Sequence, residues 1–169
     1  MDKIEVNILF TAEDIQKSYE LHLKKIQPFR SRILLILGIL LILMGVLLVF
    51  LQNLTEHITW ASWAFILYGL FVLLYYYWKY KRMGLTAFRK LVEFQHSFKY
   101  TITPDSICMI GKNSSSDSNW EHYEFAIITS NIILLYVNKL RFTMLPSKYF
   151  TDEEFKTLIE WVKDKVKCK

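Results

Sequence analysis

The hydrophobic residues of this chain gather in two long continuous runs, with shorter alternating segments before and after them. The first run covers residues 33–51 and the second covers residues 60–78, and tyrosine is the only ionisable residue type in either. A helix of 19 residues is about 28 Å long, which matches the ~30 Å hydrocarbon core of a bilayer. The pattern therefore predicts a transmembrane helical hairpin over residues 31–82.

The composition of the runs distinguishes a membrane span from the core helix of a soluble protein. Gly38, Met44 and Gly45 are the only residues of the first run outside Leu, Ile, Val and Phe, so this helix has no polar face. Its sixteen Leu, Ile, Val and Phe residues favour insertion by about 5 to 10 kcal/mol. The second run has tryptophans near its start and Tyr75–Trp78 at its end, as in an interfacial aromatic belt.

Small residues recur at the same interval in both runs. Gly38 and Gly45 lie seven residues apart in the first run, and Ser62 and Gly69 lie seven apart in the second. Small side chains on facing helices allow their backbones to approach closely. We therefore expect these residues to line the contact between the two helices.

Basic residues flank both runs on the side away from the short connection at residues 52–59, which has no Lys or Arg. They are Lys24, Lys25, Arg30, Arg32, Lys79, Lys81, Arg82, Arg89 and Lys90. The positive-inside rule then predicts a two-pass membrane protein with both termini in the cytoplasm. The basic flanks would contact anionic lipid headgroups.

Alternating and helical patterns predict the elements next to the hairpin. Within residues 1–30, the segment 3–10 alternates apolar residues as a strand does, and we expect it to join the cytosolic sheet. Thr11 is a candidate N-cap for a following amphipathic helix, which Pro28 would end. Residues 83–96 are expected to form a juxtamembrane helix.

Residues 97–169 show the pattern of a small α+β domain. Strands are expected at residues 98–103, 106–112, 124–129, 131–137 and 140–145, with a polar loop at residues 113–119. Thr151 and Glu154 form a predicted capping box that opens an amphipathic C-terminal helix. An antiparallel sheet closed by one C-terminal helix is the order of a pleckstrin-homology-like (PH-like) domain.

Several segments together resemble a known family. They are "FKYTITPDSI" (residues 98–107), Trp120 after the polar loop, and "NIILLYVNKLRFTMLPSKYFTDEEFKTLIEWV" (residues 131–162), following two spans. This combination resembles the YcxB-like family of bacterial membrane proteins. In that family Lys follows Pro directly, whereas here Ser147 separates Pro146 from Lys148. The resemblance implies a two-pass protein of the bacterial cytoplasmic (inner) membrane, and it does not assign a biochemical activity.

Charge and candidate chemistry exclude several classes. Residues 97–169 contain ten Lys or Arg and nine Asp or Glu, which does not favour a nucleic-acid partner. The two cysteines and four histidines are scattered without metal-ligand spacing, so neither a metal site nor a cofactor is expected. Glu121, His122 and Glu124 lie close together in sequence without a nucleophile, and we predict no catalytic residues.

A binding role is therefore the leading hypothesis. The candidate recognition surface consists of Asn113, Ser115, Asp117, Trp120, Arg141 and Lys148. For Trp120 a structural role as a core anchor is the alternative. The predicted function is a non-enzymatic module that binds a protein partner or a lipid headgroup at the membrane. The alternative function is immunity or resistance against a membrane-active bacteriocin or toxin, and the sequence leaves the oligomeric state open.

Overall fold

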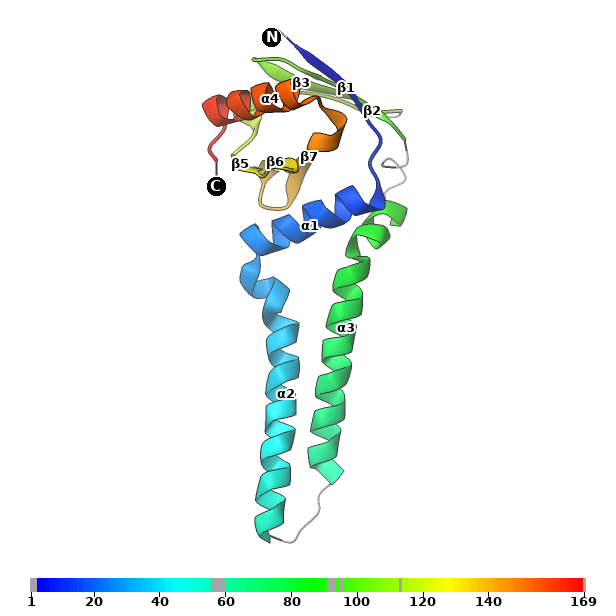
Figure 1. Ribbon diagram of the computed structural model, residues 1–169, viewed down its shortest axis with the longest axis vertical. Coiled ribbons are helices and arrows are strands. Elements are labelled where there is room, and N and C mark those ends of the chain that lie inside the picture. The colour runs from blue at the N-terminus through cyan, green and yellow to red at the C-terminus, as the bar shows by residue number, and fades with distance from the viewer. Residues whose placement is uncertain (1–2, 56–59, 91–93, 95, 113, 169) are drawn as a thin grey trace. The chain divides into compact units, whose positions relative to one another are not determined.

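The computed structural model describes residues 3–55, 60–90, 94, 96–112 and 114–168, which form α-helices and antiparallel sheets (Figure 1). The chain divides into two compact units. Met1–Ser18 and Gly84–Lys169 make up the sheet domain, and Tyr19–Met83 make up the helical hairpin. The helices α1 (Ala12–Ile26) and α3 (Trp60–Lys90) each begin in one unit and end in the other.

The helical hairpin consists of α2 (Pro28–Thr55) and α3, which run side by side in opposite directions (Figure 1). Pro28 takes the first position of α2, where its missing N–H is not needed, so the predicted end of α1 before this proline is confirmed. The helix predicted over residues 83–96 is instead a continuation of α3 as far as Lys90. Residues 91–93 and 95 lie outside the described residues.

Small residues line the contact between α2 and α3, as predicted. A Cβ atom added to Gly38 would lie 3.2 Å from the carbonyl oxygen of Gly69 and 2.8 Å from Cγ of Leu73. One added to Gly45 would lie 2.8 Å from the carbonyl oxygen of Ser62, whose side chain is fully buried. The two helices can therefore approach closely, because the glycines at these positions have no side chain between the backbones.

The remaining faces of α2 and α3 expose large apolar side chains. Leu40 is 55% exposed, Phe71 is 63% exposed and Leu74 is 68% exposed. In the most apolar stretches of the two helices only 11% and 17% of the residues are buried. Both helices are long and apolar enough to cross a membrane. A core helix of a soluble protein would instead be mostly buried.

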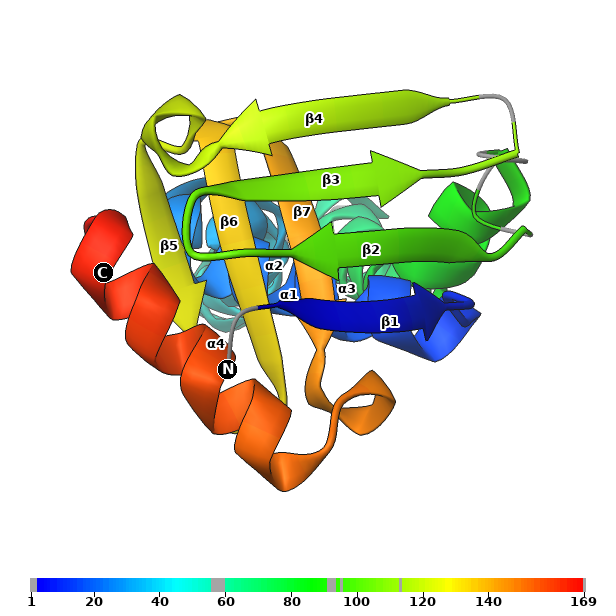
Figure 2. The same ribbon diagram turned by 90° about the horizontal axis from the view of Figure 1, so that it is seen from above.

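The sheet domain contains two antiparallel sheets whose strands cross one above the other (Figure 2). The first sheet has the order β1 (Ile4–Ile8), β2 (Phe98–Ile102), β3 (Ser106–Ile110) and β4 (Ser115–Asn119). The second has the order β5 (Phe125–Ile128), β6 (Ile132–Asn138) and β7 (Arg141–Pro146). β1 pairs with β2 from Ile4 opposite Ile102 to Ile8 opposite Phe98, although about ninety residues of sequence separate them.

The core of the sheet domain lies between the two sheets. Ile4, Val6 and Ile8 are the buried residues of β1, whereas β6 is buried at every position from Ile132 to Tyr136. The helix α4 (Asp152–Lys165) lies beside β5 in Figure 2 and buries Phe155, Leu158 and Val162. The predicted capping box at its start, Thr151 with Glu154, is confirmed. The domain is thus an α+β sandwich of two sheets with one C-terminal helix.

Candidate functional site

β4 is a polar strand at the edge of the first sheet (Figure 2). Its sequence, Ser-Ser-Asp-Ser-Asn, was expected to belong to a loop, and this expectation is wrong for residues 115–119. Five register pairs join β4 to β3, from Ser106 opposite Asn119 to Ile110 opposite Ser115. Pairing with a neighbouring strand outweighs the low β-propensity of these residue types. Asn113 lies outside the described residues.

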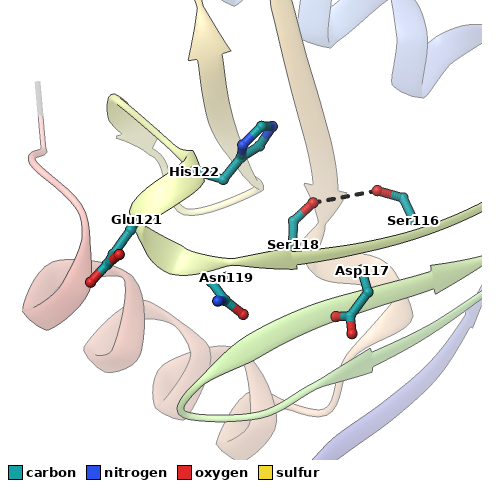
Figure 3. Close-up of a pocket in the computed structure, with 6 residues that line it drawn as sticks. All are labelled: Ser116, Asp117, Ser118, Asn119, Glu121 and His122. Atoms are coloured by element: carbon teal, nitrogen blue, oxygen red, sulfur yellow. Dashed lines mark hydrogen bonds between the residues drawn. The ribbon is translucent and has the colours of Figure 1, made fainter.

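A shallow pocket of about 520 Å³ lies against β4. It is lined by Ser116, Asp117, Ser118, Asn119, Glu121 and His122 (Figure 3). Neighbouring residues of a strand point to opposite faces of the sheet, and yet four consecutive residues of β4 line this one pocket. The pocket therefore lies along the open edge of the strand, where it reaches both faces.

A second, smaller cavity of about 110 Å³ lies between the two sheets and shares three lining residues with the pocket. These are Ser116, Ser118 and His122, which point to the same side of β4 in Figure 3. The other lining residues come from β2, β3, β6, β7 and residue 123: Tyr100, Ile107, Met109, Tyr123, Val137 and Thr143. The cavity exists because β4 presents two serines where neighbouring strands present apolar side chains. The role of these serines was not predicted, because an all-polar segment gives no local signal of a strand.

Trp120 holds the end of β4 in place from inside the domain. It begins the short 3-10 helix η2 (Trp120–His122), is 3% exposed, and its indole Nε1–H donates to the carbonyl oxygen of Thr103 at 3.1 Å. Thr103 is the first residue of the β2–β3 turn, in which its N–H donates to the Ser106 carbonyl oxygen at 2.9 Å. Trp120 is therefore a core anchor, and its place in the candidate recognition surface is corrected.

The polar residues of the pocket do not form a recognisable catalytic arrangement. Figure 3 shows the side chains of Glu121 and His122 pointing away from each other. The hydroxyls of Ser116 and Ser118 lie 3.3 Å apart and share a hydrogen bond. Within the described residues, no three His, Cys, Asp or Glu side chains gather closely enough to hold a metal ion. The pocket offers two hydroxyl groups, two carboxylates, one amide and one imidazole at a strand edge.

Lys148 belongs to a different cluster, which the sequence analysis missed. Its Nζ lies 2.8 Å from Oδ1 of Asp14, whose side chain is only 8% exposed. The other carboxylate oxygen of Asp14 accepts hydrogen bonds of 2.9 Å from the N–H and the hydroxyl of Thr11. The Tyr149 hydroxyl lies 3.3 Å from the same oxygen and donates to the carbonyl oxygen of Leu9. Lys148 is thus an ion-pair partner of the α1 N-terminus, and we call this set of five residues the α1 clamp.

The electrostatics of the α1 clamp favour a charged carboxylate. Burial alone would raise the pKa of Asp14, but the hydrogen bonds from Lys148 and Thr11 outweigh it and hold that pKa below its usual range. Burial tends to lower the pKa of Lys148, and the bond with Asp14 raises it overall. The pKa of Asp14 is lowered and the pKa of Lys148 is raised, so both shifts favour the charged form, as expected for an ion pair.

Arg141 lies at the turn between β6 and β7 and does not line the pocket on β4. The Asn138 side-chain oxygen accepts hydrogen bonds of 2.9 Å from the backbone N–H groups of Leu140 and Arg141, which fix this turn. Leu140 is 76% exposed, and Lys139 and Arg141 beside it are exposed as well. The predicted recognition residues are therefore distributed over three places: Ser115 and Asp117 on β4, Arg141 at this turn, and Lys148 in the α1 clamp.

The basic residues near the end of α3 lie over aromatic rings. Arg82 is 4.8 Å from the centroid of the Trp78 ring. Lys79 is 5.7 Å from the centroid of the Tyr75 ring, and Lys81 is 5.7 Å from that of the Tyr77 ring. The basic residues of the predicted flanks whose side chains are described are all exposed, and Arg30 lies among the side chains that are not described. This arrangement gives α3 a cationic and aromatic band on the C-terminal side of its apolar stretch.

Comparison with known proteins identifies one matching family. A protein-family model described as "YcxB-like protein" matches residues 102–162. The matched segment begins at the end of β2 and ends within α4, so it includes β3, β4, η2 and the strands of the second sheet. Neither a curated protein nor a solved structure matches the chain.

Proposed function

Residues 102–162 belong to the YcxB-like family, and from the architecture around them we propose a membrane-tethered binding module. The chain is a non-enzymatic, two-pass protein of the bacterial cytoplasmic membrane. Its sheet domain is PH-like, since seven strands in two sheets precede one C-terminal helix. The domain binds a protein partner at the cytosolic surface of the bilayer.

The apolar exterior of the helical hairpin carries the proposal. The outer faces of α2 and α3 expose leucines and aromatic residues along both helices. Exposed apolar patches of this extent are unfavourable in water and favourable in lipid. Both helices also satisfy their backbone hydrogen bonds internally, as a lipid environment requires.

The charges of the flanks support the proposed orientation. Lys24 and Lys25 lie in the last turn of α1, and Arg89 and Lys90 lie in the last turn of α3. Residues 52–59 between the spans contain no Lys or Arg. By the positive-inside rule, the end of the hairpin that joins the sheet domain faces the cytoplasm. The stacking of Lys and Arg on aromatic rings fits a headgroup region, where such rings are enriched.

The pocket on β4 favours a protein over a lipid headgroup as the partner. Asp117 and Glu121 are its charged residues, and Lys and Arg are absent from its lining. Two carboxylates would repel the phosphate of an anionic headgroup. The basic flanks supply the lipid contact instead, at ~1 kcal/mol for each Lys or Arg near an anionic surface.

Site-specific photo-crosslinking in living cells tests the proposed function. A p-benzoylphenylalanine at position 117 should give a discrete protein adduct when the full-length chain is irradiated in the membrane. The matched control places the same residue at position 160, which is exposed on α4. Equal adducts at both positions, or no protein adduct at position 117, would count against a partner site on β4.

A further inference from the structure

We propose that the partner binds as an extended segment that adds a fifth strand to the first sheet beside β4. The segment would carry basic side chains on its outward face and a branched aliphatic side chain on its inward face. This inference rests on the proposed function and specifies the class of partner.

The position of the pocket is the first argument. β4 is the last strand in the order β1-β2-β3-β4, so among the described residues no strand pairs with its outer edge. Residues from both faces of β4 line the pocket, which places it in the plane of the sheet where a further strand would lie. An added strand forms main-chain hydrogen bonds with such an edge, and side-chain pockets then provide specificity.

The edge of β5 is already contacted, and so is the residue that follows β1. The N–H of Ala126 in β5 donates to the carbonyl oxygen of Lys167 at 2.9 Å, and Ala126 also forms a parallel bridge with Cys168. At β1, the following residue Leu9 accepts a hydrogen bond from Tyr149. The edge of β4 opens instead onto a pocket of about 520 Å³.

The inner cavity is the second argument. Ser116 is paired with Met109 and Ser118 with Ile107, so the two serines occupy core-facing positions of the first sheet. Their small side chains leave a cavity of about 110 Å³. This volume is of the same order as the roughly 150 Å³ that truncation of one buried leucine leaves. One branched aliphatic side chain from an added strand would therefore fill it.

The polar atoms on the cavity wall do not require a polar ligand. Burial raises the pKa of the Tyr123 hydroxyl, and hydrogen bonds with Thr143 and Ser118 partly offset that rise. These groups therefore satisfy one another, and the hydroxyls of Ser116 and Ser118 share a hydrogen bond. The rest of the lining combines Ile107, Met109 and Val137 with Tyr100 and His122. Among the described residues no buried side-chain nitrogen or oxygen lacks a partner, so the wall presents no unpaired buried polar group to an aliphatic side chain.

The charges at the edge are the third argument. Asp117 points to the outward face of β4, opposite to the side of Ser116 and Ser118 (Figure 3). Both Asp117 and Glu121 are exposed. Opposite charges directly across neighbouring strands are favourable, whereas like charges are unfavourable. A partner strand with Lys or Arg at its outward positions therefore fits this edge, and one with Asp or Glu does not.

Peptide binding to the full-length chain tests the inference. The chain is reconstituted in nanodiscs of phosphatidylcholine alone, so that basic peptides have no anionic lipid to bind. The probe is a fluorescein-labelled peptide, Lys-Val-Lys-Leu-Lys-Val, followed by anisotropy. We expect it to bind at least tenfold more tightly than Glu-Val-Glu-Leu-Glu-Val. It should also bind at least tenfold more tightly than Lys-Val-Pro-Leu-Lys-Val, because proline removes an N–H from the ladder.

Variants of the chain test each contact. Asp117→Lys and Ser116→Leu should each weaken binding of the probe about tenfold, the first through charge and the second by filling the cavity. Asp164→Lys, an equal charge change at an exposed position of α4, is the matched control and should bind as the wild type does. Thermal unfolding of each variant verifies that the sheet domain is folded.

Three results would overturn the inference. Any one of them is sufficient. The first is equal binding of all three peptides, and the second is equal binding of the probe to empty nanodiscs. The third is wild-type binding of the probe by both Asp117→Lys and Ser116→Leu. A protein adduct at position 117 in cells, together with no peptide binding, would reject strand addition and leave the proposed function standing. Absence of both the adduct and the peptide binding would reject the two proposals together.

Discussion

Lys148 of the segment after β7 lies 2.8 Å from Asp14 of α1, so an ion pair joins two segments that are more than a hundred residues apart in sequence. Asp14 lies in the first turn of α1, and α2 with the first apolar span follows α1 in sequence. Ser18, one turn later, donates from its hydroxyl to the Asp14 carbonyl oxygen at 2.7 Å, and the same hydroxyl lies 3.3 Å from the sulfur of Met144. The start of α1 therefore contacts β7 and the segment after it at two successive turns.

The α1 clamp should contribute measurably to the stability of the sheet domain. We expect Asp14→Asn and Lys148→Met each to lower the free energy of unfolding by about 1.5 to 3 kcal/mol, the usual range for hydrogen bonds to charged groups. Because the two residues act as one pair, the double variant should lose less than the sum of the single losses. Chemical denaturation followed by circular dichroism measures all three. Strict additivity would show that the pair does not act as a unit.

The pH dependence of stability should reveal the same carboxylate. The pKa of Asp14 is lowered in the folded chain, so its contribution is present above the ordinary carboxyl pKa of about 4 and is lost as the pH falls through the folded value. The thermal midpoint should therefore fall between about pH 5 and pH 2. In Asp14→Asn this fall should be smaller. Glu5, whose pKa Lys3 and Lys99 also lower, remains in both proteins, so an identical fall in both would contradict the role of Asp14.

The close approach of α2 and α3 predicts strong sensitivity at Gly69. A Cβ there would lie 2.8 Å from the carbonyl oxygen of Gly38, so Gly69→Leu must push the helices apart. We expect a loss of about 1 to 3 kcal/mol in the stability of the hairpin, as for other overpacked contacts. Unfolding by sodium dodecyl sulfate in mixed micelles measures it. Leu70→Ile, at a neighbouring residue that is 46% exposed, is the control and should have little effect.

Trp120 should matter for folding and not for direct contact with a partner. Trp120→Phe removes the donor to the Thr103 carbonyl oxygen and part of a buried ring system. We expect a loss of about 1 to 3 kcal/mol in the stability of the sheet domain. Trp161→Phe, on a half-buried side chain of α4, should cost less. A Trp120→Phe variant of wild-type stability that no longer forms the adduct at position 117 would return Trp120 to the recognition surface.

Much of the architecture could be predicted from local sequence pattern. The alternation of Ile4, Val6 and Ile8 predicted a strand, and the apolar runs predicted two long helices. The spacing of Gly38 and Gly45 predicted a helix contact that the structure contains. These features depend on periodicity, which is visible in one sequence.

The parts that sequence analysis missed depend on contacts between distant segments. Nothing local marks residues 115–119 as a strand, because Ser, Asp and Asn favour turns and only pairing with β3 determines their conformation. In the sequence, Asp14 is one of the acidic residues that follow the predicted N-cap Thr11, and Lys148 was predicted to belong to the candidate recognition surface. Their pairing requires the second sheet and α1 to be placed side by side. The candidate site changed most for this reason, since Trp120 proved to be buried and the two serines of β4 proved to face a cavity.

The central claim is that the chain spans the membrane twice and keeps the sheet domain in the cytoplasm. Single cysteines at positions 55 and 115 test it most directly, in full-length chains whose native Cys108 and Cys168 are replaced by Ala and Ser. Position 55 lies at the end of α2, and position 115 is exposed on β4. The cells are intact, and their envelope outside the cytoplasmic membrane is permeable to the reagent. A membrane-impermeant thiol reagent should then label position 55 and leave position 115 unlabelled until the cells are lysed. Labelling of position 115 with protection of position 55 in intact cells would contradict the account.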